Sequence, residues 1–243
     1  MTVQALDQNT ANFAPAQTGW ATLRGSRMAY SRAFGALFPL GFLCYGTGFA
    51  LVMSVVGAPD FLTTIAEHRF TLIVGAFLML LNTAVDIGKA VLAFPILEAH
   101  SKRTAVAYLA AMTLEVALMA VGIVCLLMLL PLGAVAADIV GANAIGSLLV
   151  QSNGMAYQIA MLTLAVANVV VWSLTFRVRL LPRWLSLWGI IGYIVLTAGT
   201  VAELFGIPLS LLSTIPGGLF EIGLGAWLIV MGFEPAAYAK TVV

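Results

Sequence analysis

The sequence is poor in charged residues. Lys and Arg number 11 and Asp and Glu number 10, so charged types make up 9% of the 243 residues, whereas apolar types make up 62%. An average soluble domain is roughly 25% charged and roughly 45–50% apolar. So few charged side chains cannot coat a water-soluble globule of this size. The composition excludes a soluble enzyme, a disordered chain and a coiled coil, and it leaves an integral membrane protein.

Other features needed for common functions are also missing. The formal net charge is +1, so the chain offers no basic surface for nucleic acid. The two cysteines, Cys44 and Cys125, lie inside apolar runs and do not indicate a disulfide framework. The two histidines, His68 and His100, are too few for a histidine-rich metal centre. We therefore expect no metal and no cofactor.

Six long apolar stretches are present instead. A helix that crosses the ~30 Å hydrocarbon core needs roughly 20 mostly apolar residues. The stretches are Ala33–Val56, Thr71–Leu97, Thr104–Leu130, Met155–Thr175, Trp184–Leu204 and Leu209–Gly232. They predict an all-α polytopic transmembrane bundle of about six spans over residues 33–233, preceded by a polar segment (1–32) and followed by a short tail (234–243).

The basic residues predict the orientation of this bundle. Nine of the 11 Lys and Arg residues precede the first span, connect spans two and three or four and five, or follow span six. The other side has only Arg69, and Lys89 lies inside a span. An excess of Lys and Arg marks the cytoplasmic side of membrane proteins. Both termini, including the segments 1–32 and 234–243, are therefore predicted to be cytoplasmic.

The longest connection, Pro131–Gly154, is predicted to lie on the opposite side. Within it, the stretch Ala134–Val150 is apolar enough to form a separate helix. Such a helix would pack on the outer surface of the bundle or dip inward.

Four ionisable residues lie near the middle of predicted spans: Asp86 and Lys89 in the second, Glu115 in the third and Glu221 in the sixth. Each carboxyl is 11 residues from the cytoplasmic end of its span, which is ~16 Å at ~1.5 Å per residue. A charged group at the centre of a helix costs roughly 2.5–3.5 kcal/mol to insert. We therefore expect these groups to point into the bundle, toward one another.

The spacing of neighbouring residues supports this inward placement. Asn82, Asp86 and Lys89 recur at i, i+4 and i+7 and form one polar stripe. Glycines stand four residues before and after Glu221, which lets a neighbouring helix come close. Supporting polar residues on other spans are Tyr108, Asn168, Tyr193 and Glu203.

Three carboxyls face one ammonium in this predicted cluster. Burial and neighbouring negative charge both disfavour the ionised form, so we expect one or two of the acids to be protonated at neutral pH. Such groups suit a proton relay, an ion-coupled transporter or a site for a cationic ligand. The alternative is a set of interhelical hydrogen bonds, worth about 0.6 kcal/mol on average, that simply hold the bundle.

The C-terminal third is similar to a known family. The run Arg179-Leu-Leu-Pro-Arg-Trp-Leu185, followed by Gly189 and Gly192-Tyr193, resembles a bacterial membrane family catalogued as domain of unknown function 4386. The final span, with Gly218-Leu-Phe-Glu-Ile-Gly-Leu-Gly-Ala-Trp-Leu228, is also similar, and the likeness extends over most of residues 24–233. The resemblance implies a bacterial inner-membrane protein. It carries over no catalytic residue, because that family has no established activity.

Three classes of function fit these observations. The first in rank is a non-catalytic membrane module, such as an anchor, an assembly factor or a sensor partner. The second is a small transporter or proton-linked permeation protein that uses the cluster Asn82, Asp86, Lys89, Glu115 and Glu221. The third is an intramembrane enzyme that acts on a lipid or apolar small molecule with a carboxyl as acid or base. Expected partners are the lipid bilayer and either another membrane protein or a second copy of the chain.

Overall fold

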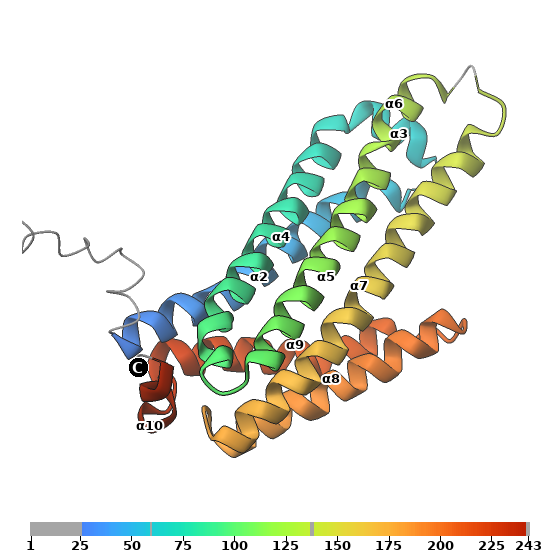
Figure 1. Ribbon diagram of the computed structural model, residues 1–243. Helices are drawn as coiled ribbons and strands as arrows, with labels where there is room; N and C mark the ends of the chain where they lie inside the picture. Colours follow the sequence, from blue (N-terminus) through green and yellow to red (C-terminus); the bar gives the residue numbers. More distant parts are fainter. Residues whose placement is uncertain (1–25, 59, 137–138, 242–243) are drawn as a thin grey trace, which may run out of the picture.

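The computed structural model describes residues 26–58, 60–136 and 139–241 (Figure 1). Over these ranges the chain is helical and contains no strand. The helices are α2 (Arg27–Val56), α3 (Phe61–Glu67), α4 (Arg69–Glu98), α5 (Lys102–Leu127), α6 (Leu129–Ala134), α7 (Ala142–Val178), α8 (Arg183–Leu204), α9 (Ser210–Val230) and α10 (Pro235–Tyr238), followed by the 3₁₀ helix η2 (Ala239–Thr241). Six stretches in the described part are long and apolar enough to cross a membrane. The predicted polytopic helix bundle is confirmed.

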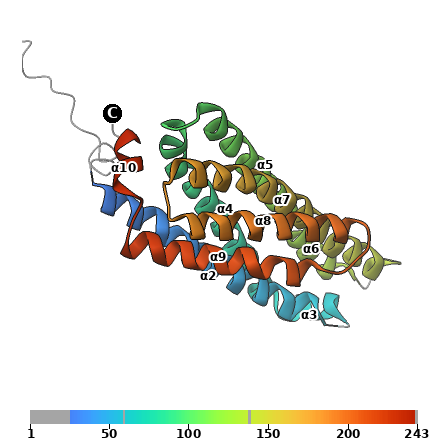
Figure 2. The ribbon, with the colours of Figure 1, turned by 90° about the horizontal axis from the view of Figure 1, so that it is seen from below.

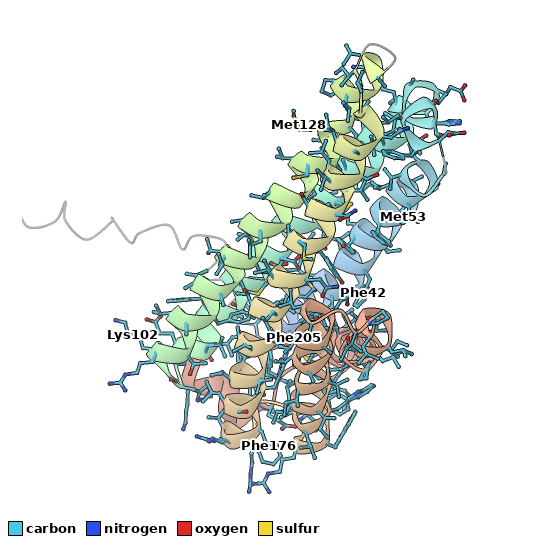
Figure 3. All side chains as sticks on the ribbon, turned by 90° about the vertical axis from the view of Figure 1, so that its right-hand side faces the viewer. Phe42, Met53, Lys102, Met128, Phe176 and Phe205 are labelled. Carbon is cyan, nitrogen blue, oxygen red and sulfur yellow. The ribbon has the colours of Figure 1, made fainter. Side chains whose placement is uncertain are left out.

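The long helices form a closed ring. Each of α2, α4, α5, α7, α8 and α9 packs against the next in chain order, and α9 returns to pack against α2 (Figures 1 and 2). Successive helices run in opposite directions, so α2, α5 and α8 begin at one end, which we call the basic end. The short helices α3 and α6 lie at the opposite or far end, beyond the reach of the shorter α8–α9 hairpin (Figure 3).

Two apolar clusters fill the ring near its ends. Toward the basic end, aromatic side chains dominate, among them Phe34, Phe38, Trp172, Phe220 and Phe233. Toward the far end, the buried side chains are mostly aliphatic, among them Val55, Ile65, Leu72, Ile123 and Leu129. The residues of α2, α4 and α5 that lie between these clusters in sequence form a separate layer, which contains Asn82, Asp86, Lys89 and Glu115, and Glu221 of α9 borders it.

Close helix contacts depend on glycine. A Cβ added to Gly48 of α2 would lie 2.7 Å from the carbonyl oxygen of Gly75 on α4. A Cβ added to Gly225 of α9 would lie 2.9 Å from the carbonyl oxygen of Gly35 on α2. Small residues allow such backbone approach between membrane helices, so these glycines set the width of the ring.

Replacing Gly48 by Ala is expected to lower the free energy of unfolding by about 1–3 kcal/mol, because the added methyl meets backbone atoms that cannot move alone. Gly46 on the same helix is the matched control, since a Cβ there meets nothing within 4 Å. The comparison is unfolding in mixed detergent micelles. Equal stability of the Gly48→Ala and Gly46→Ala proteins would contradict this packing.

The seam between α2 and α9 is closed at the basic end by hydrogen bonds to carbonyls at the end of α9. Arg27 donates to the carbonyl oxygens of Met231, at 3.2 Å, and Phe233. The Nε of Arg32 donates to the carbonyl oxygen of Ile229 at 3.1 Å. Cationic side chains at a helix C-terminus satisfy carbonyls that lack helical partners and interact favourably with the helix dipole. Arg27 and Arg32, which contributed to the predicted orientation, therefore also hold α2 against α9.

The structure differs from the sequence-based expectation at the far-end connection. Residues 142–154 are the first turns of α7 and continue the fourth span, so the part of the expected helix from Ala142 to Val150 is not a separate surface helix; residues 137 and 138 lie outside the described residues. The break comes earlier, at Gly141, which adopts a left-handed conformation with φ 81°. Inside this helix, Asn153 lies against Gly122 of α5, where its amide nitrogen is 2.8 Å from the position a Cβ would take. A helix accommodates this polar side chain because its neighbour is small.

The ends of the chain also differ from the expected boundaries. Helix α2 begins at Arg27, so residues 27–32 belong to the first span, while residues 1–25 lie outside the described residues. After α9 the chain turns back, and Tyr238 is only 3% exposed and stacks on Phe233. The described part of the tail therefore packs on the bundle. That both termini are cytoplasmic remains a prediction.

Candidate functional site

Polar side chains fill the layer between the two apolar clusters. Asn82, Asp86 and Lys89 come from one face of α4, Glu115 comes from α5 and Glu221 comes from α9. The first four residues are between 1% and 8% exposed, and the Glu221 side chain is 18% exposed. The i, i+4, i+7 spacing on α4 places its three polar residues on the face turned into the ring. The structure thus brings together all five residues that the sequence analysis grouped.

Four of these residues and a tyrosine form a continuous network. The Asp86 carboxylate accepts from Asn82 Nδ2 at 2.7 Å and pairs with Lys89 Nζ at 2.8 Å. Lys89 Nζ also lies 4.0 Å from Glu221 Oε2. The hydroxyl of Tyr193 donates to Glu221 Oε1. This network connects α4, α9 and α8 across the inside of the ring.

The Lys89 ammonium is surrounded by groups that stabilise its charge. Asp86 and Glu221 flank it, and the ring of Phe38 lies 5.1 Å away in cation–π geometry. Helix α2 can approach because Gly41 faces the ammonium, where a Cβ would lie only 3.2 Å from Nζ. The single cation of this layer is therefore already shared between two acids and one aromatic face.

Glu115 has no comparable compensation. It is 1% exposed, and its Oε2 is buried without a hydrogen-bond partner among the described residues. It lies within electrostatic range of Asp86, Lys89 and Glu221. A buried carboxylate without a partner is costly unless it takes up a proton or a counter-ion. Glu115 is therefore the member of this layer that is open to a proton or a ligand.

A cavity borders these groups. Its volume is about 150 Å³, and we call it the central chamber. All six long helices contribute to its lining: Gly41, Phe42, Tyr45, Asn82, Asp86, Lys89, Glu115, Met119, Tyr157, Met161, Leu164, Tyr193, Leu196, Thr214, Gly217, Gly218 and Glu221. Since about 10–15 Å³ by a comparable measure accommodates one water, the chamber has room for several waters or a small organic molecule.

A second, smaller cavity lies toward the basic end. It measures about 40 Å³ and is lined mainly by apolar side chains. Asp86, Lys89, Tyr193 and Glu221 border both cavities. The ionic network therefore separates the central chamber from this narrower space.

Two aromatic residues of the chamber were missed in the sequence analysis of the site. The rings of Tyr45 on α2 and Tyr157 on α7 stack with centroids 5.8 Å apart, and Phe49 continues the stack behind Tyr45 at 6.0 Å. The signal for Tyr157 was its place on the same stripe as Asn168. Tyr45 gave a weaker signal, because the sequence analysis singled out no polar residue on its span.

The four supporting residues take different places. Tyr193 hydrogen-bonds to Glu221 and borders both cavities, whereas Tyr108 and Asn168 border only the smaller one. Asn168 also donates to the carbonyl oxygen of Leu164 within its own helix at 2.9 Å. Glu203 lies near the end of α8 and lines neither cavity, and its Oε2 is also buried without a hydrogen-bond partner among the described residues. The functional roles of these residues remain predictions.

Replacing Tyr193 by Phe is expected to lower the free energy of unfolding by about 1.5–3 kcal/mol, because it removes the donor to a buried acidic group. Tyr108→Phe is the matched control: this tyrosine is also buried but has no hydrogen bond described to the cluster, so the loss of stability should be smaller. Thermal unfolding in detergent gives both values. A larger loss for Tyr108→Phe would contradict the assigned hydrogen bond.

The charge of the layer determines which ligands it favours. Three acids face one Lys, so the formal balance is negative and favours a proton or a cation over an anion. Within the described residues, no three His, Cys, Asp or Glu side chains form a group that could hold a metal ion. The charge balance of the layer therefore suits proton uptake or binding of a cation.

A known family of proteins matches most of the chain. The profile of a family described as a domain of unknown function, DUF4386, matches residues 33–232. No curated protein and no solved structure matches the chain. The matched range includes the ionic network, Glu115 and the whole lining of the central chamber. The chain belongs to the DUF4386 family.

Proposed function

We propose that this multi-pass membrane protein takes up a proton or a small cation in its central chamber and works as a small transporter or proton-linked permeation protein. The observation that supports this function most is the state of Glu115. Its carboxyl group is buried beside a cavity, and one of its oxygens has no hydrogen-bond partner in the described part of the chain. A purely structural acid would be expected to be hydrogen-bonded.

The electrostatic argument follows from the pairing of Lys89. Its ammonium contacts Asp86 at 2.8 Å and lies 4.0 Å from Glu221, and it acts on Glu115 only over a longer range, without a direct ion pair. Uptake of a proton or a cation at Glu115 would remove the cost of an uncompensated buried charge. Release would restore that cost, so Glu115 could both bind and release a proton or a cation.

The position of the network suits a permeation pathway. The larger cavity lies on one side of the network and the smaller cavity lies on the other. The 4.0 Å contact between Lys89 and Glu221 is the longest link of the network. Movement of α9 relative to α4 would break this link first and join the two cavities.

A non-catalytic membrane module is the second candidate, and one observation favours it. The contacts Lys89–Glu221 and Tyr193–Glu221 tie together α4, α8 and α9, as expected for polar groups that hold a bundle. In that case Asp86, Lys89 and Glu221 would be needed for assembly of the bundle. Replacing Glu115 would then change neither flux nor stability.

The test is a flux measurement on the wild-type protein in liposomes with a trapped pH dye. When a pH or cation gradient is imposed, we expect dye responses faster than those of protein-free liposomes. Heat-unfolded protein in the same lipid controls for leakage. If none of the imposed gradients produces a protein-dependent response, the transport proposal fails and the membrane module becomes the better account.

A further inference from the structure

We propose that the central chamber binds an amphiphilic organic cation, a protonated amine or quaternary ammonium with a short hydrocarbon chain, which arrives from the bilayer between α2 and α9. This inference rests on the proposed function and specifies its ligand class and its route.

Glu115 and its aromatic neighbours indicate where the positively charged head of the ligand binds. A carboxylate can only accept hydrogen bonds, and its unpartnered oxygen is suited to an ammonium. The stacked rings of Tyr45 and Tyr157 border the same chamber, and their hydroxyls lie within electrostatic range of Glu115. An aromatic face beside a carboxylate is a recognised kind of ammonium site. Phe49 and Tyr157 cover the two faces of Tyr45, so the face proposed for the cation is that of Tyr157 turned away from Tyr45. An anionic ligand would add to the negative charge already there.

The apolar part of the lining favours an organic cation over a hard metal ion. Ions such as Ca²⁺ take six to eight oxygen ligands. The described residues form no group of His, Cys, Asp and Glu that could hold a metal ion, and the lining of the chamber includes the apolar side chains of Met119, Met161, Leu164 and Leu196. Apolar lining with a few charged or polar groups is typical of sites for small organic molecules. Glu115 would therefore neutralise the head while the thioethers and aliphatic side chains contact the body of the ligand.

The route is indicated by Phe42. This residue lines the chamber, yet its side chain is 41% exposed on the outside of the ring. Its ring lies over Gly218 of α9, where an added Cβ would be 3.6 Å from Phe42 Cζ. Figure 3 places Phe42 where the α8–α9 hairpin meets α2. At this point only the side chain of Phe42 separates the chamber from the acyl chains, and this side chain can rotate.

The other routes are more strongly closed. Toward the far end, the aliphatic cluster around Val55, Leu72 and Ile123 fills the ring. Toward the basic end, α2 and α9 meet backbone to backbone at Gly35 and Gly225. A ligand that partitions into the membrane would reach the chamber by the shortest path, through the seam at Phe42 and Gly218.

The experiment is photolabelling in nanodiscs. The probe is hexylammonium carrying a diazirine on its chain, and the charge-reversed control is the corresponding hexyl sulfate. Specific labelling is the part suppressed by excess unlabelled hexylammonium, and mass spectrometry maps it to peptides. We expect specific labels in the ranges 41–45 and 214–218, and at least a tenfold loss of specific labelling in Glu115→Gln. Leu43→Ala, which alters a lipid-facing neighbour of Phe42, should keep wild-type labelling.

The outcomes separate this inference from the proposed function. Labels confined to the far-end ranges 61–67 and 129–134, equal labelling by the sulfate, or unchanged labelling in a folded Glu115→Gln protein would each overturn the inference. Proton flux without specific labelling would leave the proposed function standing and remove the organic ligand. Specific labelling without proton flux would support the organic ligand and remove the proton linkage.

Discussion

Replacing Lys89 by Met is expected to lower the free energy of unfolding by about 3–5 kcal/mol, which is the typical effect of removing one partner from a buried ion pair. Lys89 is 8% exposed, and its ammonium contacts Asp86 at 2.8 Å. Its loss leaves Asp86 and Glu221 without a counter-charge between the helices. Met preserves most of the side-chain length, so the effect reports on charge more than on volume. Unfolding in mixed detergent micelles, followed by circular dichroism, measures it.

The control for this prediction is Asp86→Asn combined with Lys89→Met. The double variant removes both charges of the 2.8 Å pair and should recover a substantial part of the stability lost in Lys89→Met. If the single Lys89→Met variant is as stable as wild type, the ammonium does not occupy the buried position described here.

Replacing Glu115 by Gln is expected to reduce protein-dependent flux more than tenfold while the free energy of unfolding stays within about 1 kcal/mol of wild type. Gln has nearly the same shape but cannot exchange a proton near neutral pH. The substitution should cost little stability, because one carboxylate oxygen has no hydrogen bond to lose. Flux and stability are measured on the same purified sample, the first in liposomes with a trapped pH dye.

Glu98→Gln is the matched control for this effect. Glu98 is the last residue of α4 and is exposed, so the same chemical change there should leave both flux and stability unaltered. Normal flux in Glu115→Gln would remove Glu115 from the pathway. A large loss of stability in that variant would instead indicate that its carboxyl group has a structural partner.

Much of the fold was predictable from sequence because it depends on local properties. Length and hydropathy determine which segments can cross a bilayer, and helical spacing determines which residues share a face. The stripe of Asn82, Asp86 and Lys89 could therefore be assigned to one side of α4. The early start of α7 was missed, because the residues near Asn153 are polar and their tolerance depends on Gly122, a residue of another helix.

The site was predictable in part for the same reason. The cost of a charge in lipid predicts that Asp86, Glu115 and Glu221 turn inward, and the structure places them around one chamber. Neither the stacking of Tyr45 on Tyr157 nor the closure of α9 on α2 follows from any single span. Both arise from contacts between residues more than 100 positions apart, which require the assembled ring.

The proposed function depends above all on the convergence of ionisable side chains from different helices inside the ring. A double-mutant cycle between Lys89→Met on α4 and Glu221→Gln on α9 measures this most directly. Their atoms are 4.0 Å apart, and we predict a coupling energy of about 1 kcal/mol or more, with the double variant less destabilised than the sum of the single ones. The control pair is Lys89→Met with Glu67→Gln, at an exposed residue of α3. The stability effects of these two substitutions should be additive. Additivity within about 0.5 kcal/mol for Lys89 and Glu221 would contradict the account.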